Sequence, residues 1–511
     1  MSQCSIHGAL GTVKKRADRG PVAPMHPRRD VGGPNPCGRP YYGFPDPWHR
    51  SMRPTQVRAR SGVPADRIAA VFESASRRYV ETHPRSQQLI GPRGIAGFYD
   101  GVPMHWMRDW SMPFPFVVDS AHGATLRDVD GHEYADFCLG DTGGMFGHSP
   151  APVAEAVARQ SGKGLTYMLP TEEALAVGRL LAERFGLPHW QIATTATDAN
   201  RFALRVARAV TGRPKILVFN GCYHGTVDET FVRLVGGRVV QRPGLLGQAS
   251  DLTQWARVVE FNDVDGLRAE LAHGDVACVI AEPVMTNSCM VLPAPGFHDA
   301  LRTLTRETGA LLLIDETHTI STGPGGYTRA RGLEPDLFVL GKPIAGGVPA
   351  SAWGFTEDVR RRLDGVRAAT PSGHTGMGTT LSANALALAA MRATLEHVMT
   401  PAAYGAMERL ASVLELNLEQ AIEEYCVPWH VVRLGARVEL VCGPGPLRNG
   451  TEAEAAHAPA LERALHLSLL NEGCLIAPFH NMMLVCPATT EDQVGRLCDA
   501  FERALANLTT G

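Results

Sequence analysis

Four short apolar runs constrain the fold of this chain more than any other feature of its sequence. None of them alternates polar and apolar residues, as a strand with one face in water would. Stretches with helical character, such as residues 198–212, lie between them. The pattern predicts an α/β fold with a doubly wound, mostly parallel sheet that is buried on both faces. The runs are "KILVF" (215–219), "VACVIAEP" (276–283), "ALLLIDE" (310–316) and "DLFVL" (336–340).

The sequence on either side of these runs divides into further parts. Residues 1–62 carry eleven Lys and Arg against three Asp and no Glu, with dense Pro and Gly, so we expect a mostly disordered basic tail. Residues 63–145 predict a helix and then a hairpin that turns at the dipeptide Asp130-Gly131. We assign residues 146–381 to the large domain, and expect residues 382–511 to form a smaller α+β domain that the 63–145 segment joins.

The overall composition excludes several classes of protein. The chain has 511 residues, 44% of them hydrophobic and 20% charged, with a formal net charge of −3, so nothing in the whole-chain charge favours nucleic acid as a partner. No apolar run is long enough to span a membrane, and the N-terminus lacks a secretory pattern. Scattered cysteines without a CxxC pair indicate reduced thiols in a cytoplasmic protein, and no HxxxH or Cys/His cluster indicates a metal site.

Polar side chains stand where the apolar runs end. In an open α/β sheet, ligands bind at the carboxyl ends of the strands, so these side chains are expected to meet at one edge. The segment "TTATDAN" (194–200) precedes the helix at 198–212, and the free backbone N–H groups of a helix start bind anions. A lysine, an acid, an aromatic ring and an anion site together fit pyridoxal phosphate (PLP). The side chains are Lys342, Asp315, Glu316, Glu282, Tyr223 and His224.

Six fragments in the same order give the chain a resemblance to the class III, fold-type I aminotransferases. Within them it is most similar to the glutamate-1-semialdehyde aminomutase and β-amino-acid aminotransferase branch, over about residues 65–508. The resemblance implies a PLP-dependent enzyme that forms a homodimer with shared active sites. The fragments are "DVDGHEYADF…GHSPAPV", "ATTATDANRFALRVARAVTGRPKILVFNGCYHG", "AEPVMTN", "LLLIDETHT", "PDLFVLGKPIAGGVPASAWG" and "GTTLSANALALAA".

The same resemblance implies a role for each cofactor residue. Lys342 would be the Schiff-base lysine, and Asp315 would bind the pyridine nitrogen. The others are Tyr223, stacked on the ring with His224 beside it; Ala196 and Thr197, holding the phosphate; Thr380, reaching the phosphate of the neighbouring subunit; Glu282 and Asn287, near the O3 side; and Thr317, whose hydroxyl would lie against a cofactor face where the family has Val.

Three residues are candidates for the substrate pocket. Trp106 stands at about the place where β-amino-acid relatives have an arginine, which suggests a bulky or aromatic amino donor, and Arg108 follows two residues later. Arg437 enters a predicted strand of the small domain, and an arginine fork suits the carboxylate of a keto acid. The segment at 320–328 is expected to be a flexible loop that closes over the partner site.

The function that this pattern favours is amino-group transfer from an amine, a β-amino acid or an aromatic amino acid to a keto acid. An aminomutase, which moves the amino group within one substrate, and a racemase would need the same cofactor residues, so both remain open. A non-catalytic PLP-binding regulator, whose basic residues 1–62 contact nucleic acid, is a third alternative.

Overall fold

The computed structural model of the chain describes residues 61–478 and 480–509. The prediction of a disordered tail therefore lies outside the described residues, except at its last two positions. Ser61 is buried, and its carbonyl oxygen accepts a hydrogen bond of 2.7 Å from the indole nitrogen of Trp429. The folded part of the chain thus begins no later than Ser61.

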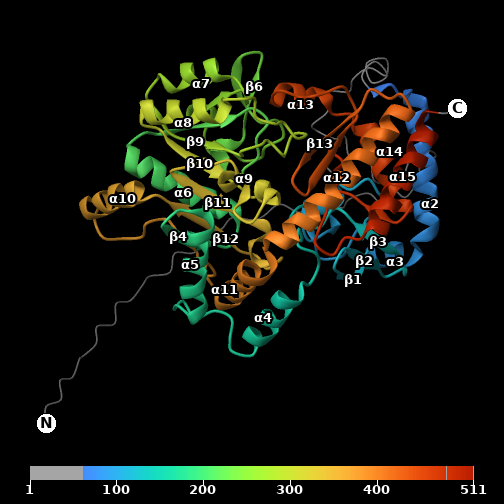
Figure 1. Cartoon of the computed structure of the whole chain (residues 1–511), viewed down its shortest axis with the longest axis horizontal. Coiled ribbons are helices and arrows are strands. Elements are labelled where there is room, and N and C mark those ends of the chain that lie inside the picture. Colours follow the sequence, from blue (N-terminus) through green and yellow to red (C-terminus); the bar gives the residue numbers. More distant parts are fainter. Residues whose placement is uncertain (1–60, 479, 510–511) are drawn as a thin grey trace, which may run out of the picture. The chain divides into compact units, whose positions relative to one another are not determined.

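A seven-stranded sheet organises the middle of the chain (Figure 1). Its strand order is β4-β12-β11-β10-β9-β5-β8, and β12 alone runs antiparallel to its neighbours. This confirms the predicted, mostly parallel sheet. The strands are β4 (His189–Ala193), β5 (Lys215–Phe219), β8 (Ala256–Val259), β9 (Val276–Ala281), β10 (Leu311–Asp315), β11 (Leu337–Leu340) and β12 (Ser351–Phe355).

Helices cover both faces of this sheet, which explains why its central strands are apolar throughout. In β10, Leu311 and Leu313 belong to the hydrophobic core beneath α6, whereas Leu312 and Ile314 belong to the core beneath α7 and α8. The four residues from Leu311 to Ile314 are therefore buried and apolar, and the buried Asp315 ends the strand. The covering helices are α6 (Ala196–Thr211), α7 (Val264–Leu271), α8 (Phe297–Thr308) and α10 (Glu357–Ala369).

Segments from both ends of the described chain build a second, smaller part. Strand β15 from the C-terminal segment pairs with β3 from the N-terminal segment, and α2 lies beside α14 and α15 (Figure 1). The elements are α2 (Ala65–Thr82), β1 (Val118–His122), β2 (Thr125–Asp128), β3 (Glu133–Asp136), α12 (Pro401–Glu424), β13 (His430–Leu434), β14 (Arg437–Val441), α14 (Pro459–Asn471), β15 (Cys474–Leu475), β16 (Met482–Leu484) and α15 (Glu491–Thr509).

The remaining elements are mostly shorter. The helices among them are α3 (Pro84–Ile90), α4 (Ala151–Ser161), α5 (Glu172–Phe185), α9 (Gly326–Ala330), α11 (Ala385–Ala393) and α13 (Gly450–Ala456), and the strands are β6 (Val232–Val235) and β7 (Arg238–Gln241). None of the helices in the described ranges is long and apolar enough to cross a membrane. The described cysteines are free thiols, and all but Cys426 are buried.

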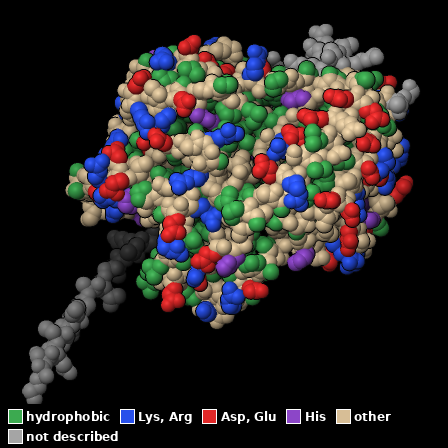
Figure 2. Space-filling view, in the orientation of Figure 1, with side chains coloured by type: hydrophobic (Ala, Val, Ile, Leu, Met, Phe, Trp, Pro, Cys, Tyr) green, Lys and Arg blue, Asp and Glu red, His purple; other side chains and the backbone are tan. Residues whose placement is uncertain are grey.

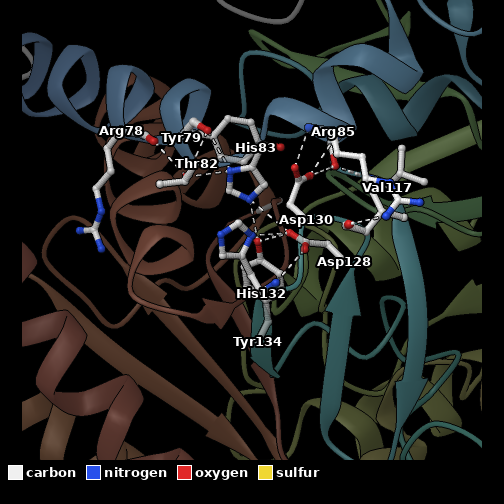
Figure 3. A network of polar contacts seen from close by, with 12 residues as sticks. Arg78, Tyr79, Thr82, His83, Arg85, Val117, Asp128, Asp130, His132 and Tyr134 are labelled. Atoms are coloured by element: carbon white, nitrogen blue, oxygen red, sulfur yellow. Dashed lines mark hydrogen bonds and ion pairs between the residues drawn. The ribbon is translucent and has the colours of Figure 1, made fainter.

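A buried polar network joins α2 to the β2–β3 hairpin (Figure 3). One carboxylate oxygen of Asp128 accepts hydrogen bonds from the Tyr134 hydroxyl at 2.8 Å and from Nδ1 of His132 at 2.9 Å. His83, which ends α2, places Nε2 2.7 Å from the Tyr134 hydroxyl and Nδ1 2.8 Å from the carbonyl oxygen of Tyr79. The network fixes where the helix ends relative to the hairpin.

The same network corrects the predicted two-residue turn. Asp128 accepts a further hydrogen bond from the backbone N–H of His132 at 2.9 Å, so the hairpin loop spans residues 129–132. His83, Asp128 and His132 also have potential metal-ligand atoms within 4.8 Å of one another, a group that the sequence search missed because His83 is distant in the chain. Each of the three already has protein partners.

Glu316 anchors the segment that the sequence predicts to be a flexible loop. Residues 319–330 instead form a short 3-10 helix (Thr319–Thr322) and α9, with Thr319 and Tyr327 buried. The Glu316 carboxylate is fully buried and accepts hydrogen bonds from the Thr319 hydroxyl and from the backbone N–H groups of Tyr327 and Thr328. Burial raises the pKa of Glu316 to about 7 even though these hydrogen bonds oppose the shift.

Replacing His83 tests the network. His83→Ala removes a buried ring that stacks on Tyr79 and hydrogen bonds to two partners, so the free energy of unfolding should fall by about 2–4 kcal/mol. The measurement is urea denaturation followed by circular dichroism. His122→Ala removes an exposed histidine from β1 and serves as the control, with an expected change within about 0.5 kcal/mol. Equal effects of the two substitutions would contradict the assigned role.

Glu316→Gln tests the cost of the buried carboxylate. Burial raises the pKa of Glu316 in the folded state to about 7, from an ordinary value of 4.5. The folded state therefore favours the protonated carboxyl group. This contribution to stability is fully present below pH 4.5 and is lost as the pH rises through 7. Between pH 4.5 and 8, the free energy of unfolding of the wild-type protein should therefore fall by about 3 kcal/mol relative to that of the Gln variant. Any difference between the two proteins that does not depend on pH leaves this change unaffected. Denaturation curves of both proteins across this range measure the difference. Parallel pH profiles would show that the carboxylate is not destabilised by burial.

Candidate active site

Lys342 lies directly beyond the end of β11, where the sequence predicts the reactive lysine. Its backbone is left-handed, with a φ of 45°. Its Nζ lies 2.6 Å from Oδ2 of Asp141 and 2.5 Å from Nε2 of His318. The turn also approaches α6 closely, because a Cβ atom on Gly341 would lie 2.8 Å from the Cβ of Ala196. The lysine and the start of α6 are therefore neighbours.

Asp315 ends the adjacent strand, β10, and is held as a carboxylate. Its Oδ2 accepts hydrogen bonds of 2.9 Å from Nδ1 of His224 and from the amide nitrogen of Asn200, and its Oδ1 accepts one of 2.6 Å from the Thr317 hydroxyl. Burial alone would raise the pKa of Asp315, but these partners lower it to about 2. Burial alone would lower the pKa of His224, but its hydrogen bond to Asp315 helps to raise this pKa to about 10.

The start of α6 carries the residues that the sequence predicts to bind an anion. Thr195 caps the helix through its side chain, and the first backbone N–H groups of a helix have no partner within it. The hydroxyl oxygen of Thr197 accepts a hydrogen bond of 3.1 Å from the backbone of Thr226. Gly225 makes this closure feasible, because it has a φ of 78° and a Cβ there would lie 2.1 Å from that hydroxyl oxygen. Ala196 and Thr197 thus lie at a helix start close to Lys342, where an anion could contact both.

Arg437 enters the site from β14 and is fully buried. Its Nη2 donates hydrogen bonds of 2.6 Å to the Thr142 hydroxyl and 3.0 Å to Nδ1 of His318, so His318 lies between the lysine and the arginine. Burial, followed by the charges of Lys342 and Arg437, holds the pKa of His318 well below its usual range. Nε and Nη1 of Arg437 have no hydrogen-bond partner among the described residues.

The predicted ring and wall residues lie beside one another. Tyr223 follows β5, and burial raises its pKa. The ring of Trp106 lies 6.0 Å from the Tyr223 ring, centroid to centroid. Arg108 is directed elsewhere in this structure, since it pairs with Asp100 at 3.2 Å. Thr380 is exposed in a turn before α11, and no hydrogen bond between described residues joins it to the lysine.

Two predicted contacts differ in detail. The Thr317 hydroxyl is directed at Asp315 and not at an open face, because the carboxylate is the stronger acceptor. Glu282 is buried beyond the end of β9; it accepts hydrogen bonds from the Thr286 hydroxyl and, at 3.0 Å, from the amide of Asn287. Burial raises the pKa of Glu282.

Three neighbours of the site escaped the sequence prediction. Asp141 and Thr142 follow β3, about 200 and 300 positions from the side chains they contact, and Asn200 lies within α6. Asn200 ends the segment "TTATDAN", whose pattern indicates an anion site but not a contact with Asp315. The only sequence signal for Asp141 and Thr142 is the glycine-rich turn "LGDTGG", which predicts an unusual backbone but no partner.

The arrangement fits PLP on grounds that the structure provides. It combines a reachable lysine, a buried carboxylate that stays ionised, an aromatic ring and the start of a helix, which are the kinds of group that PLP requires. Three residues of the site have buried atoms without a hydrogen-bond partner among the described residues: Nε2 of His224, Oδ1 of Asn200, and Nε and Nη1 of Arg437. A ligand would supply partners for such atoms.

Comparison with known proteins agrees with this fit. Residues 106–505 match the family model described as "Aminotransferase class-III". A glutamate-1-semialdehyde 2,1-aminomutase from Thermomicrobium roseum is 33% identical over 403 residues, covering 78% of this chain and 92% of that protein. The solved glutamate-1-semialdehyde aminomutase from Pseudomonas aeruginosa PAO1 is 49% identical, covering 88% of this chain and all of that one, with a TM-score of 0.86. A variant of it was solved in complex with PMP.

A second kind of relative is more distant. The solved β-phenylalanine aminotransferase from Variovorax paradoxus is 29% identical, covering 85% of this chain and 97% of that one, with a TM-score of 0.75. Aminomutases and aminotransferases thus share this fold and these motifs. The chain belongs to the class-III aminotransferase family of PLP-dependent, fold-type I enzymes.

Proposed function

We propose that this chain is an aminomutase that uses PLP on Lys342 to move an amino group within one carboxylate-bearing substrate. The observation that carries the chemistry is the position of Lys342, in contact with His318 and through it with the buried Arg437. The choice of an aminomutase over the aminotransferase favoured by the sequence is supported by relatives that are 33% and 49% identical and bear that name.

Each residue around the cofactor has one task. Asp315 would hold the proton of the pyridine nitrogen, because a carboxylate with a pKa of about 2 is ionised at neutral pH. The start of α6 binds the phosphate through Ala196 and Thr197, while Tyr223 packs on the ring. PLP supplies an aldehyde carbon for the lysine and an electron sink for the substrate. Lys342, once freed by the incoming amine, moves the proton at its Nζ.

Arg437 binds the carboxylate of the substrate. Its Nε and Nη1 are buried without partners among the described residues, so both remain able to donate hydrogen bonds to acceptor atoms of a bound anion. Nη2 is already held by Thr142 and His318, so the guanidinium is oriented before the substrate arrives. Trp106, beside Tyr223, forms the wall of the pocket.

Two copies of the chain are expected to complete the site. Thr380 is exposed in this single chain, as a residue that reaches the phosphate of a partner subunit would be. The nucleic-acid-binding alternative has little support in the described part. On the face in Figure 2, Lys and Arg side chains are interspersed with Asp and Glu, so this face offers no basic stripe.

The requirement for a keto acid separates the two enzyme classes. Incubated with glutamate-1-semialdehyde alone, the holoprotein should turn over many times without an added keto acid, because an aminomutase returns the amino group to the same molecule. Product formation followed by chromatography measures this. Turnover that occurs only with an added keto acid, in a screen of amines, β-amino acids and aromatic amino acids, would assign the aminotransferase function instead.

The control for that experiment is Lys342→Ala. Borohydride should fix the cofactor to the wild-type protein but not to this variant, and turnover should fall by about 10²- to 10⁴-fold or more. A variant that still fixes the cofactor or still turns over would remove Lys342 from its assigned role.

The proposed role of Arg437 is tested by comparing substrates that have a carboxylate with amines that lack one. Arg437→Met removes the fork while keeping a similar volume, and should lower kcat/KM for a carboxylate-bearing substrate by about 10- to 100-fold, the value of a charge-assisted hydrogen bond. An amine without a carboxylate should lose little. Arg437→Lys keeps the charge but not the fork and should recover only part of the loss. Equal losses for both kinds of substrate would point to a structural role.

A further inference from the structure

Residues 139–142 form a left-handed segment beside the active site. Their φ values are 46° for Leu139, 57° for Gly140, 50° for Asp141 and 78° for Thr142. Only one of the four is a glycine, and such conformations cost other residues on the order of 1–3 kcal/mol each. A left-handed backbone at non-glycine residues persists where the surrounding structure holds it. It is useful where it directs a side chain to a partner that the side chain could not reach from another backbone conformation.

The surroundings do hold the segment. The carboxylate of Asp136 accepts hydrogen bonds of 2.8 Å from the backbone N–H groups of Cys138 and Leu139, and the backbone of Gly144 donates one of 2.8 Å to the carbonyl oxygen of Leu139. Hydrogen bonds thus fix the segment both at its first residue and across its turn. They stabilise the left-handed conformation of the loop after β3.

Two consecutive side chains of this segment contact the two cations of the site. Oδ2 of Asp141 lies 2.6 Å from Nζ of Lys342, and the Thr142 hydroxyl accepts the hydrogen bond from Arg437. The side chains of Asp141 and Lys342 remain 32% and 28% exposed, so both open onto the space where a cofactor and substrate would enter.

Among the described residues, Asp141 is the anion in direct contact with Lys342. His318 touches the same Nζ but is uncharged at neutral pH, Arg437 lies behind His318, and Tyr223 lies near Asp141. Burial would raise the pKa of Asp141, but the positive charge of Lys342, with a further contribution from Arg437, holds it well below its usual range. Asp315 belongs to a separate group of hydrogen bonds around His224.

We infer that Asp141 is the counter-ion of the Lys342 nitrogen in the PLP-loaded enzyme and keeps the proton on that nitrogen at neutral pH. This inference rests on the proposed use of PLP at Lys342. A carboxylate in contact with a protonated nitrogen stabilises its charged form. The same carboxylate then meets the ammonium group of the incoming substrate, so Asp141 also favours binding of the amine in its charged form.

The pH dependence of the visible absorbance of the bound cofactor tests this role directly. Asp141→Asn removes the charge while keeping the shape, and Asn tolerates a positive φ better than most residues. The midpoint of the absorbance change should fall by about 1–3 pH units. Asp141→Glu should restore part of the shift. Asp119→Asn, which removes an exposed carboxylate from β1, should leave the midpoint unchanged.

A second variant separates charge from backbone strain. Asp141→Gly relieves the left-handed conformation, so its Tm should equal or exceed that of the wild-type protein, yet its midpoint should fall as in Asp141→Asn. A midpoint that stays within about 0.3 pH units in either variant, with cofactor still fixed to Lys342 by borohydride, would overturn the inference alone. A wild-type protein without the visible band would overturn the proposed function, and the inference with it.

Discussion

The parallel pairing of β9, β10 and β11 is the constraint on which the site depends. Neighbouring strands lie about 4.8 Å apart, so residues that follow strands of the same direction meet at one edge of the sheet. Glu282, Asp315 and Lys342 each lie at or just beyond such a strand end, and the register of β10 with β11 fixes Asp315 opposite Val339. Their proximity is therefore set by the sheet, not by any contact between the three side chains.

The sequence predicts most of the sheet and of the cofactor site because both depend on local patterns. The run at 215–219 coincides with β5, and the helix expected at 198–212 begins two residues earlier because Thr195 caps it. The contacts of Asp141 could not be predicted, because they join distant positions through a backbone that non-glycine residues rarely adopt. The direction of the Thr317 hydroxyl could not be predicted for another reason: it depends on the Asp315 carboxylate lying 2.6 Å away in the folded chain, which residue spacing does not report.

The site keeps two carboxylates ionised by different means. Asp315 is supported by donated hydrogen bonds, from His224, Asn200 and Thr317, and is nearly inaccessible. Asp141 is supported by nearby cations and stays partly open. His318 lies between two of these cations and stays neutral, so it can accept a hydrogen bond from one and contact the other without adding charge. A fixed acid and an approachable acid can therefore serve different partners: one the cofactor ring, the other the reacting nitrogen.

Arg437 is a fully buried charge whose hydrogen bonds are incomplete within the described part of the chain. A buried guanidinium with two unpaired nitrogen atoms is costly, since each unsatisfied charged donor loses its hydration without compensation. Packing does not relieve this cost, because the hydrogen bonds to Thr142 and His318 use Nη2 only. An anion with two acceptor atoms would relieve it. Nε and Nη1 of Arg437 are therefore the atoms at which this part of the site is incomplete, and the proposed carboxylate of the substrate would supply acceptors for them.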